Sequence, residues 1–235
     1  MKIIWNKVTP LSKLVALTLF VLLPFIGFYY GMQYGALAAF LHNGPAAPGR
    51  APVVNGDDYY KNTAEWQTST DDQRFTIAYP LDFDVQGATG LTQSEWRTDA
   101  NGTPGTKLFN LTIQRLFEPH TNFIDAQLGV GESNDASALK KCLMPDPTGV
   151  PVPTSTAMLS GVPFIVFHSG GAGAGNYYET TSYRTVHNGE CWAVEYTIHS
   201  TALANYPAEY HLHEFNNARV TDILERIVHT FKFLH

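Results

Sequence analysis

The longest uncharged stretch of the chain runs from Leu14 to Phe40, and it constrains the fold more than any other feature. It contains no Asp, Glu, Lys or Arg, whereas Lys2, Lys7 and Lys13 stand before it. A helix of about 20 apolar residues crosses the hydrocarbon core of a bilayer. Because this stretch is longer than that, the sequence predicts a transmembrane anchor over residues 14–40.

The lysines before this anchor predict its orientation. Basic residues beside a membrane span tend to stay in the cytoplasm, so residues 1–13 are expected to form a cytoplasmic basic leader. The rest of the chain would then be extracytoplasmic, on a single-pass protein of the cell membrane. A cleaved signal peptide is the alternative, because Ala36-Leu37-Ala38 has the small residues of a cleavage site. The length of the apolar stretch favours an uncleaved anchor, and cleavage near Ala38 stays open.

The part of the chain beyond the anchor is acidic. It holds all 21 Asp and Glu and all but the three leading lysines of the 15 Lys and Arg, so its formal charge is −9. Such a charge argues against nucleic acid and anionic lipid headgroups as partners. Residues 41–66 are rich in Pro, Gly, Ala and Asn and predict a linker. Residues 67–235 have the size of one domain.

Alternating apolar residues predict strands that are buried on one face. The clearest sets are Phe75, Ile77 and Tyr79; Phe109, Leu111 and Ile113; and Trp192, Val194, Tyr196 and Ile198. Strands with one buried face are typical of antiparallel sheets. The unbroken apolar run from Phe164 to Phe167 is typical of a central strand.

The dipeptide Asn188-Gly189 predicts a β-hairpin. Both residues tolerate the positive φ that a two-residue type I′ turn requires. The turn would join two long strands and place His187 opposite Glu190.

Two helices are predicted, one of them close to the C-terminus. Its apolar residues recur at three- and four-residue spacing, as on the buried face of an amphipathic helix. They are Val220, Ile223, Leu224, Ile227, Val228 and Phe231. A shorter helix is expected from about Asn134 to Cys142, with Ser133 or Asn134 as its N-cap. Strands, a short helix, more strands and a long helix predict an α+β fold, a central antiparallel sheet flanked by helices.

Two segments of the acidic part resemble a known family. Residues 74–80, with the pattern Phe-x-Ile-x-Tyr-Pro, resemble the opening strand of PsbP-like domains. Residues 223–233, which end in Thr-Phe-Lys-Phe, resemble the closing helix and tail of that family. The leader and apolar run resemble small membrane-anchored proteins of uncharacterised bacterial candidate phyla. The resemblance implies a PsbP-like sandwich that serves as a binding or assembly accessory, and it transfers no catalytic residue because the matching positions are core residues.

The two cysteines, Cys142 and Cys191, predict a disulfide. An even number of cysteines in an exported domain favours pairing. The bond would tie the short helix to the start of a hairpin strand. Two buried free thiols are the alternative, and a redox role is not expected because the cysteines do not form a close Cys-x-x-Cys pair.

The densest group of metal-type side chains lies near the C-terminal helix. His211, His213, Glu209 and Glu214 are the candidate ligands, because zinc sites use such groups. No third His follows at a recognised spacing, so solvated loop histidines are the favoured interpretation.

Two other groups of residues have side chains or spacing that can occur in functional sites. Glu195, Thr197 and His199 share one strand face, which is interpreted as a polar outer face. The glycine-rich residues 170–175 could suggest a phosphate-binding loop. Strand residues follow them rather than a helix, so a flexible hairpin loop is favoured.

Together these features predict a non-enzymatic, membrane-anchored, extracytoplasmic domain. It would bind or assemble with an unknown protein or small molecule, and no cofactor is expected. One alternative is a metal-dependent hydrolase or metal-binding protein that uses His211 and His213. The other is a subunit of a surface filament.

Overall fold

The computed structural model describes residues 57–71, 74–87, 96–98, 100, 102–145 and 155–234, together with residues 13, 18–20 and 22–23. The chain divides into two compact units, Met1–Pro52 and Val53–His235.

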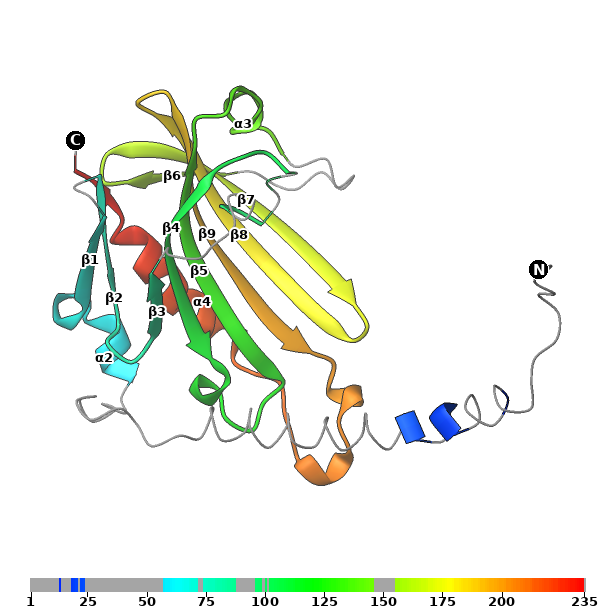
Figure 1. The fold of residues 1–235 in the computed structure, drawn as a ribbon. Coiled ribbons are helices and arrows are strands. Elements are labelled where there is room, and N and C mark those ends of the chain that lie inside the picture. Colours follow the sequence, from blue (N-terminus) through cyan, green and yellow to red (C-terminus); the bar gives the residue numbers. More distant parts are fainter. Residues whose placement is uncertain are drawn as a thin grey trace, which may run out of the picture. The chain divides into compact units, whose positions relative to one another are not determined.

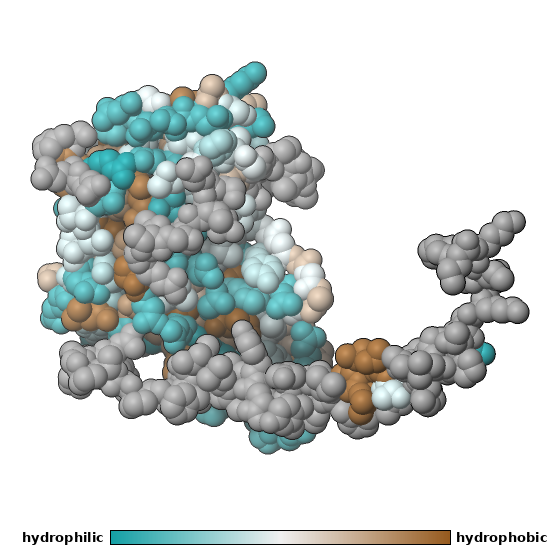
Figure 2. Space-filling view, in the orientation of Figure 1, coloured by the Kyte–Doolittle hydropathy of each residue, from teal (hydrophilic) through white to brown (hydrophobic). Residues whose placement is uncertain are grey.

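The first unit holds the predicted leader and anchor. Its described residues have helical backbone, and their exposed apolar side chains, among them Leu19 and Phe20, form the small brown group in Figure 2. Most of residues 1–56, including the cleavage site near Ala38, lies outside the described residues. Within the described part of the chain, no helix combines the length and the apolar character needed to cross a membrane.

The second unit contains two antiparallel sheets and few helices (Figure 1), so its class is α+β, as the alternating residues predicted. The larger sheet has the strand order β3-β4-β5-β9-β8-β7-β6. Its strands are β3 (Asp84–Gly87), β4 (Thr106–Gln114), β5 (Phe123–Ser133), β6 (Ser155–Leu159), β7 (Val162–Gly173), β8 (Asn176–His187) and β9 (Glu190–Thr201). The smaller sheet has the order β1-β2-β10, with β1 (Gln67–Asp71), β2 (Phe75–Tyr79) and β10 (Lys232–Phe233).

The helices are short except for the one near the C-terminus. The α-helices of the second unit are α2 (Asp57–Lys61), α3 (Ala136–Lys141) and α4 (Asn217–His229). Single 3-10 turns are η1 (Thr63–Glu65), η2 (Arg115–Phe117), η3 (Leu203–Asn205) and η4 (Ala208–Tyr210). Helix α4 confirms the predicted amphipathic helix, because the five predicted apolar residues within it, from Val220 to Val228, are buried.

Helix α4 packs against the larger sheet through the main hydrophobic core. The predicted inward residues of β2, β4 and β9 all belong to this core. A polar contact crosses it, since the hydroxyls of Tyr183 and Tyr196 each donate to the Glu225 carboxylate at 2.5 Å. Burial, then the hydrogen bond to Glu225, raises the pKa of both tyrosines well above the ordinary value. The two hydroxyls therefore stay protonated and fix α4 on β8 and β9.

The β8–β9 hairpin has the predicted turn and register. Asn188 and Gly189 have φ values of 51° and 80°, and His187 lies opposite Glu190. The apolar run Phe164–Phe167 lies in β7, which is inside the sheet but next to the edge strand β6.

Three details differ from the sequence predictions. The N-cap of α3 is Asp135, not Ser133 or Asn134, because its carboxylate accepts the N–H groups of Ser137 and Ala138. Ser133 is still part of β5.

The glycine-rich residues are the second difference. Residues 170–173 are paired within β7, and the turn itself is only Ala174-Gly175. Glycine does not prevent the ladder from continuing, because its N–H and C=O bond to the neighbouring strand like those of any residue.

The third difference concerns the stretch expected to be a linker, residues 41–66. Its last part forms α2 and η1, and the side chains of Tyr60 and Trp66 are buried in the main core. The core therefore includes residues from the predicted linker.

Candidate functional site

The candidate site lies on the face of the larger sheet opposite α4. Side chains alternate across a strand, so Trp192, Val194, Tyr196 and Ile198 face the main core while Cys191, Ala193, Glu195 and Thr197 face the other way. This second face was expected to be polar and open. In the structure Ala193 and Glu195 are only 1% and 7% exposed, because segments distant in the sequence cover part of the face.

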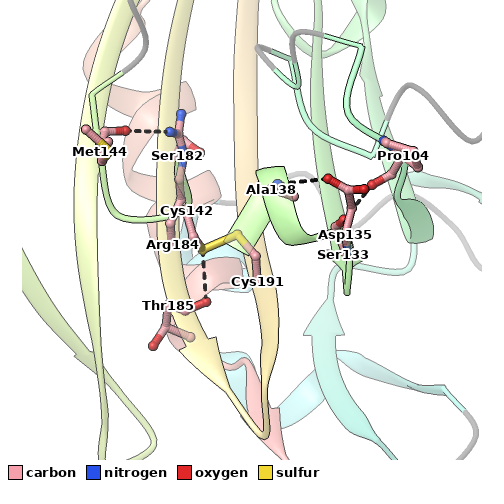
Figure 3. Close-up of a disulfide and its surroundings, with 10 residues drawn as sticks. All are labelled: Pro104, Ser133, Asp135, Ala138, Cys142, Met144, Ser182, Arg184, Thr185 and Cys191. Carbon is pink, nitrogen blue, oxygen red and sulfur yellow. Dashed lines mark hydrogen bonds between the residues drawn. A yellow bond between two sulfur atoms is a disulfide. The ribbon is translucent and has the colours of Figure 1, made fainter. Parts of the chain in front are cut away.

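A disulfide holds one of these covering segments in place. Cys142, at the end of α3, bonds to Cys191 at the start of β9, with a Cα–Cα distance of 5.7 Å (Figure 3). The predicted pairing of the short helix with a hairpin strand is therefore present in the structure. The disulfide, Trp96, Ala100, Ala138 and Ala193 form a second, smaller hydrophobic cluster.

Trp96 covers the sheet at a position where two glycines leave room for it. A Cβ atom placed on Gly105 would lie 2.3 Å from the indole ring, and one placed on Gly131 would lie 2.1 Å from the carbonyl oxygen of Trp96. Its indole N–H donates to the Thr103 carbonyl at 3.2 Å. Trp96 is thus held by close packing against the two glycines and by one hydrogen bond. Its side chain forms a wall that covers part of the second face of the sheet.

Beside this wall lies a cleft of about 360 Å³. Ligand pockets are usually concave sites of a few hundred Å³ or more. The cleft is bounded by residues from the covering segment and from β4, β5 and β9. They are Trp96, Arg97, Thr98, Lys107, Asn110, Gln127, Gly129, Glu195 and Thr197.

Most of the lining is polar, and part of it is deeply buried. Arg97, Asn110 and Glu195 are only 5%, 7% and 7% exposed. One oxygen of the Glu195 carboxylate accepts the backbone N–H of Thr98 at 2.6 Å. Arg97 lies over the Trp96 ring, 5.3 Å from its centroid. Burying such groups is unfavourable unless they find partners, and the Thr98 N–H is one such partner for Glu195.

The next row of the same sheet face carries one histidine, His199, with two polar partners. Nε2 of His199 lies 2.9 Å from the side-chain oxygen of Asn176, and Nδ1 lies 3.4 Å from a carboxylate oxygen of Asp125. The Tyr178 ring stacks on the imidazole with centroids 4.4 Å apart. These contacts hold the His199 ring by both of its nitrogens and by one of its faces.

The predicted metal ligands do not come together in the structure. His211, His213, Glu209 and Glu214 are all exposed. The backbone of His213 instead bonds to the chain beside β5, donating to the His120 carbonyl at 3.2 Å and accepting from Asn122 at 3.0 Å. Across the residues that the structure describes, no three His, Cys, Asp or Glu side chains could hold a metal ion.

Sequence reasoning placed Glu195 and Thr197 together on one strand face, but interpreted that face as a polar outer surface and missed the rest of the cleft. Asn110 and Gln127 stand at the polar positions of alternating strands, where a side chain is ordinarily read as solvent-exposed. The available signal was the pair of glycines, Gly129 and Gly131, inside a strand, since such glycines often mark a close approach of another group.

No protein-family model matches the chain, and no curated protein matches it significantly. A crystal structure of a protein from Bacteroides thetaiotaomicron VPI-5482 is similar with a TM-score of 0.35 and 10% sequence identity. The similarity covers 68% of this chain and 44% of that one.

Proposed function

We propose that this protein is a non-enzymatic, membrane-anchored domain that binds a small polar ligand outside the cytoplasm. The observation that carries the proposal is the cleft beside Trp96, in which Asn110 and Glu195 are buried yet line an accessible space. Residues that are kept polar at such depth point to recognition.

The extracytoplasmic location rests on two features. The uncharged stretch from Leu14 to Phe40 follows a lysine-rich leader, and such a pattern favours a cytoplasmic N-terminus. The paired cysteines Cys142 and Cys191 suit an oxidising compartment, because cytosolic thiols are kept reduced. We propose that residues 14–40 remain in the membrane and carry the domain on the outer side.

The domain itself is proposed to be a PsbP-like sandwich. The strand Phe75–Tyr79 and the closing helix Asn217–His229 carry the sequence resemblance, and antiparallel sheets with a flanking helix agree with that expectation. A PsbP-like domain would act as an accessory that binds or assembles, which fits a ligand cleft better than a catalytic centre.

A binding screen on the full-length chain in detergent micelles tests this function. Amino acids, organic acids and monosaccharides are added, and the thermal unfolding midpoint is measured. A ligand at 100 times its Kd stabilises the folded state by about 2.7 kcal/mol, so at least one class should raise the midpoint clearly.

The matched variants for this screen lie on one strand. Asn110→Leu should abolish the ligand-induced shift, whereas Thr112→Leu, two residues along β4 and outside the cleft lining, should keep it. If no compound shifts the midpoint, or if both variants respond like the wild type, the cleft is not a binding site.

A further inference from the structure

Three charged side chains line the cleft, Arg97, Lys107 and Glu195, and the last two do not pair with each other. Lys107 and Glu195 both line it, and within the described part of the chain Lys107 makes no ion pair or hydrogen bond. The Glu195 carboxylate uses one oxygen for the Thr98 N–H, and its second oxygen makes no hydrogen bond to the residues described. A buried carboxylate in this state is stabilised by a cationic partner.

The floor between the two charges is a glycine. In the sheet register Gly129 lies directly between Asn110 on β4 and Glu195 on β9. A Cβ atom placed on Gly129 would lie 3.6 Å from Cε of Lys107, so the lysine stem crosses this floor. Neighbouring strands are about 4.8 Å apart. Asn110 and Glu195 are two strands apart, so the row between them is about 10 Å wide, enough for a small molecule.

Asn110 provides an independent indication of a ligand. Its side chain is more than nine-tenths buried and lines the cleft, yet its amide has no hydrogen-bond partner among the described residues. A primary amide offers both a donor and an acceptor, so it can bind either a carboxylate or an ammonium group from the side.

We propose that the cleft binds a zwitterion with an α-amino-acid head group, whose carboxylate pairs with Lys107 and whose ammonium group pairs with Glu195. The inference rests on the proposed function, and it names the ligand class of that site. Charge-assisted hydrogen bonds at both ends, with Asn110 between them, would satisfy three groups that lack a partner among the described residues: the Lys107 ammonium, the second oxygen of Glu195 and the Asn110 amide.

The test removes each charge from the ligand and from the protein in turn. The full-length chain in detergent micelles is titrated calorimetrically with L-alanine, L-glutamate, L-lysine, L-phenylalanine and L-serine. For the best zwitterion, the carboxyl-amidated and N-acetylated derivatives are then compared. Each derivative should bind at least tenfold more weakly than its parent.

Two variants assign the charges to the two residues. Lys107→Met should weaken the zwitterion at least tenfold but change the affinity of the amidated ligand less than twofold, because that ligand lacks the carboxylate. Glu195→Gln, which keeps an oxygen for the Thr98 N–H, should show the same pattern with the N-acetylated ligand. The exposed Lys140→Met and Glu209→Gln are the matched controls and should bind like the wild type.

The outcomes separate this inference from the proposed function. If methyl α-glucoside or acetate binds in the cleft while none of the five zwitterions does, the zwitterion assignment is wrong and the binding function stands. If every compound fails, both are wrong. Equal losses for parent and capped ligands in Lys107→Met or Glu195→Gln would also overturn the assignment, because they would show a general structural effect.

Discussion

At the scale of single residues, the most constrained part of the site is the place where Trp96 packs against the sheet. Two glycines determine whether its ring and backbone fit against the sheet, and neither position has a positive φ. The requirement is therefore space rather than backbone freedom. The neighbouring Gly129 has no such restriction, since its added Cβ atom would meet only Phe109 and Lys107 at 3.4 Å or more.

Gly131→Ala should destabilise the domain by about 2 kcal/mol, the usual range for overpacking a filled site. The physical reason is the 2.1 Å approach between the new Cβ atom and the Trp96 carbonyl oxygen. Urea denaturation measures the free energy of unfolding. Gly129→Ala is the matched control and should change the free energy of unfolding by well under 1 kcal/mol. Equal effects of the two variants would contradict the claim that Gly131 leaves room for Trp96.

Glu190→Gln tests the repulsion between two carboxylates, that of Glu132 near the end of β5 and that of Glu190 at the start of β9. The pKa of Glu132 is raised, chiefly by burial; Arg74 opposes the shift and Glu190 adds to it. A carboxyl whose folded pKa is raised binds more protons in the folded state, so stability falls as pH rises from about 4.3 through the raised pKa. Removing the Glu190 charge should make this fall smaller.

The expected result is a variant that is more stable than the wild type at pH 7. After discounting for solvent screening, the gain should be below about 1 kcal/mol, and it should vanish below about pH 4, where the carboxyls are protonated. Thermal unfolding across this pH range gives the comparison. The exposed Glu209→Gln is the control, and a wild type more stable than Glu190→Gln at pH 7 would refute the interpretation.

At the scale of elements, α4 and α3 are attached to opposite faces of the larger sheet by different chemistry. Helix α4 combines an apolar face with the Glu225 carboxylate, which accepts two buried tyrosine hydroxyls. Helix α3 has six residues and one buried alanine, so it depends on the disulfide. The two attachments can be tested separately.

Glu225→Leu should destabilise the domain by about 2 kcal/mol or more, because it leaves the hydroxyls of Tyr183 and Tyr196 buried without an acceptor. The control is Asp222→Leu on the same helix, which removes only an exposed ion pair with Arg226 and should cost less than about 1 kcal/mol. Chemical denaturation measures the free energy of unfolding of both variants. Equal losses of stability in the two would contradict this role of Glu225.

Loss of the disulfide should destabilise the domain by about 4 kcal/mol, from the loop entropy of a closure between residues 49 apart. Cys142→Ala/Cys191→Ala avoids adding polar groups to the buried cluster. Denaturation midpoints are measured for the variant and for the wild type with and without a thiol reductant. If the reductant leaves the wild-type midpoint unchanged, although alkylation shows both cysteines reduced, the bond does not stabilise α3 on the sheet.

At the scale of the whole molecule, the chain combines a basic leader, an uncharged stretch and an acidic remainder. Some cationic side chains of the acidic remainder form ion pairs, such as Arg219 with Glu118 and Arg226 with Asp222. Lys107 in the cleft has no such partner within the described residues. Because Arg97 and Lys107 outnumber Glu195 in its lining, the cleft differs locally from the net negative charge of the domain.

Membrane topology can be measured on intact cells that express the protein. The protein should remain in the membrane fraction after carbonate extraction, because residues 14–40 would be buried in lipid. External protease should digest residues 67–235 once any outer barrier is opened, and Cys142 and Cys191 should resist alkylation until reduced. A protease-protected domain with freely alkylated cysteines would place it in the cytoplasm instead.

The sequence predicted the elements well where their signal is local. The strand at Phe75–Tyr79, the Asn188-Gly189 turn and the buried residues of α4 were read from periodicity or from the φ preference of two residues. It was less reliable at boundaries. The N-cap of α3 shifted to Asp135, because several adjacent polar residues could each have capped the helix.

The amino-acid sequence by itself determined the antiparallel strands, the long helix and the charge distribution, because each depends on residues close together in the chain. Only the tertiary structure decided that Asn110 and Glu195 line a covered cleft rather than an open face. Trp96, which fits against the sheet because of two glycines, covers part of this face, and the disulfide holds α3 on the neighbouring part. Alternation along a strand predicts two faces, but it does not reveal which distant segment will cover the second one.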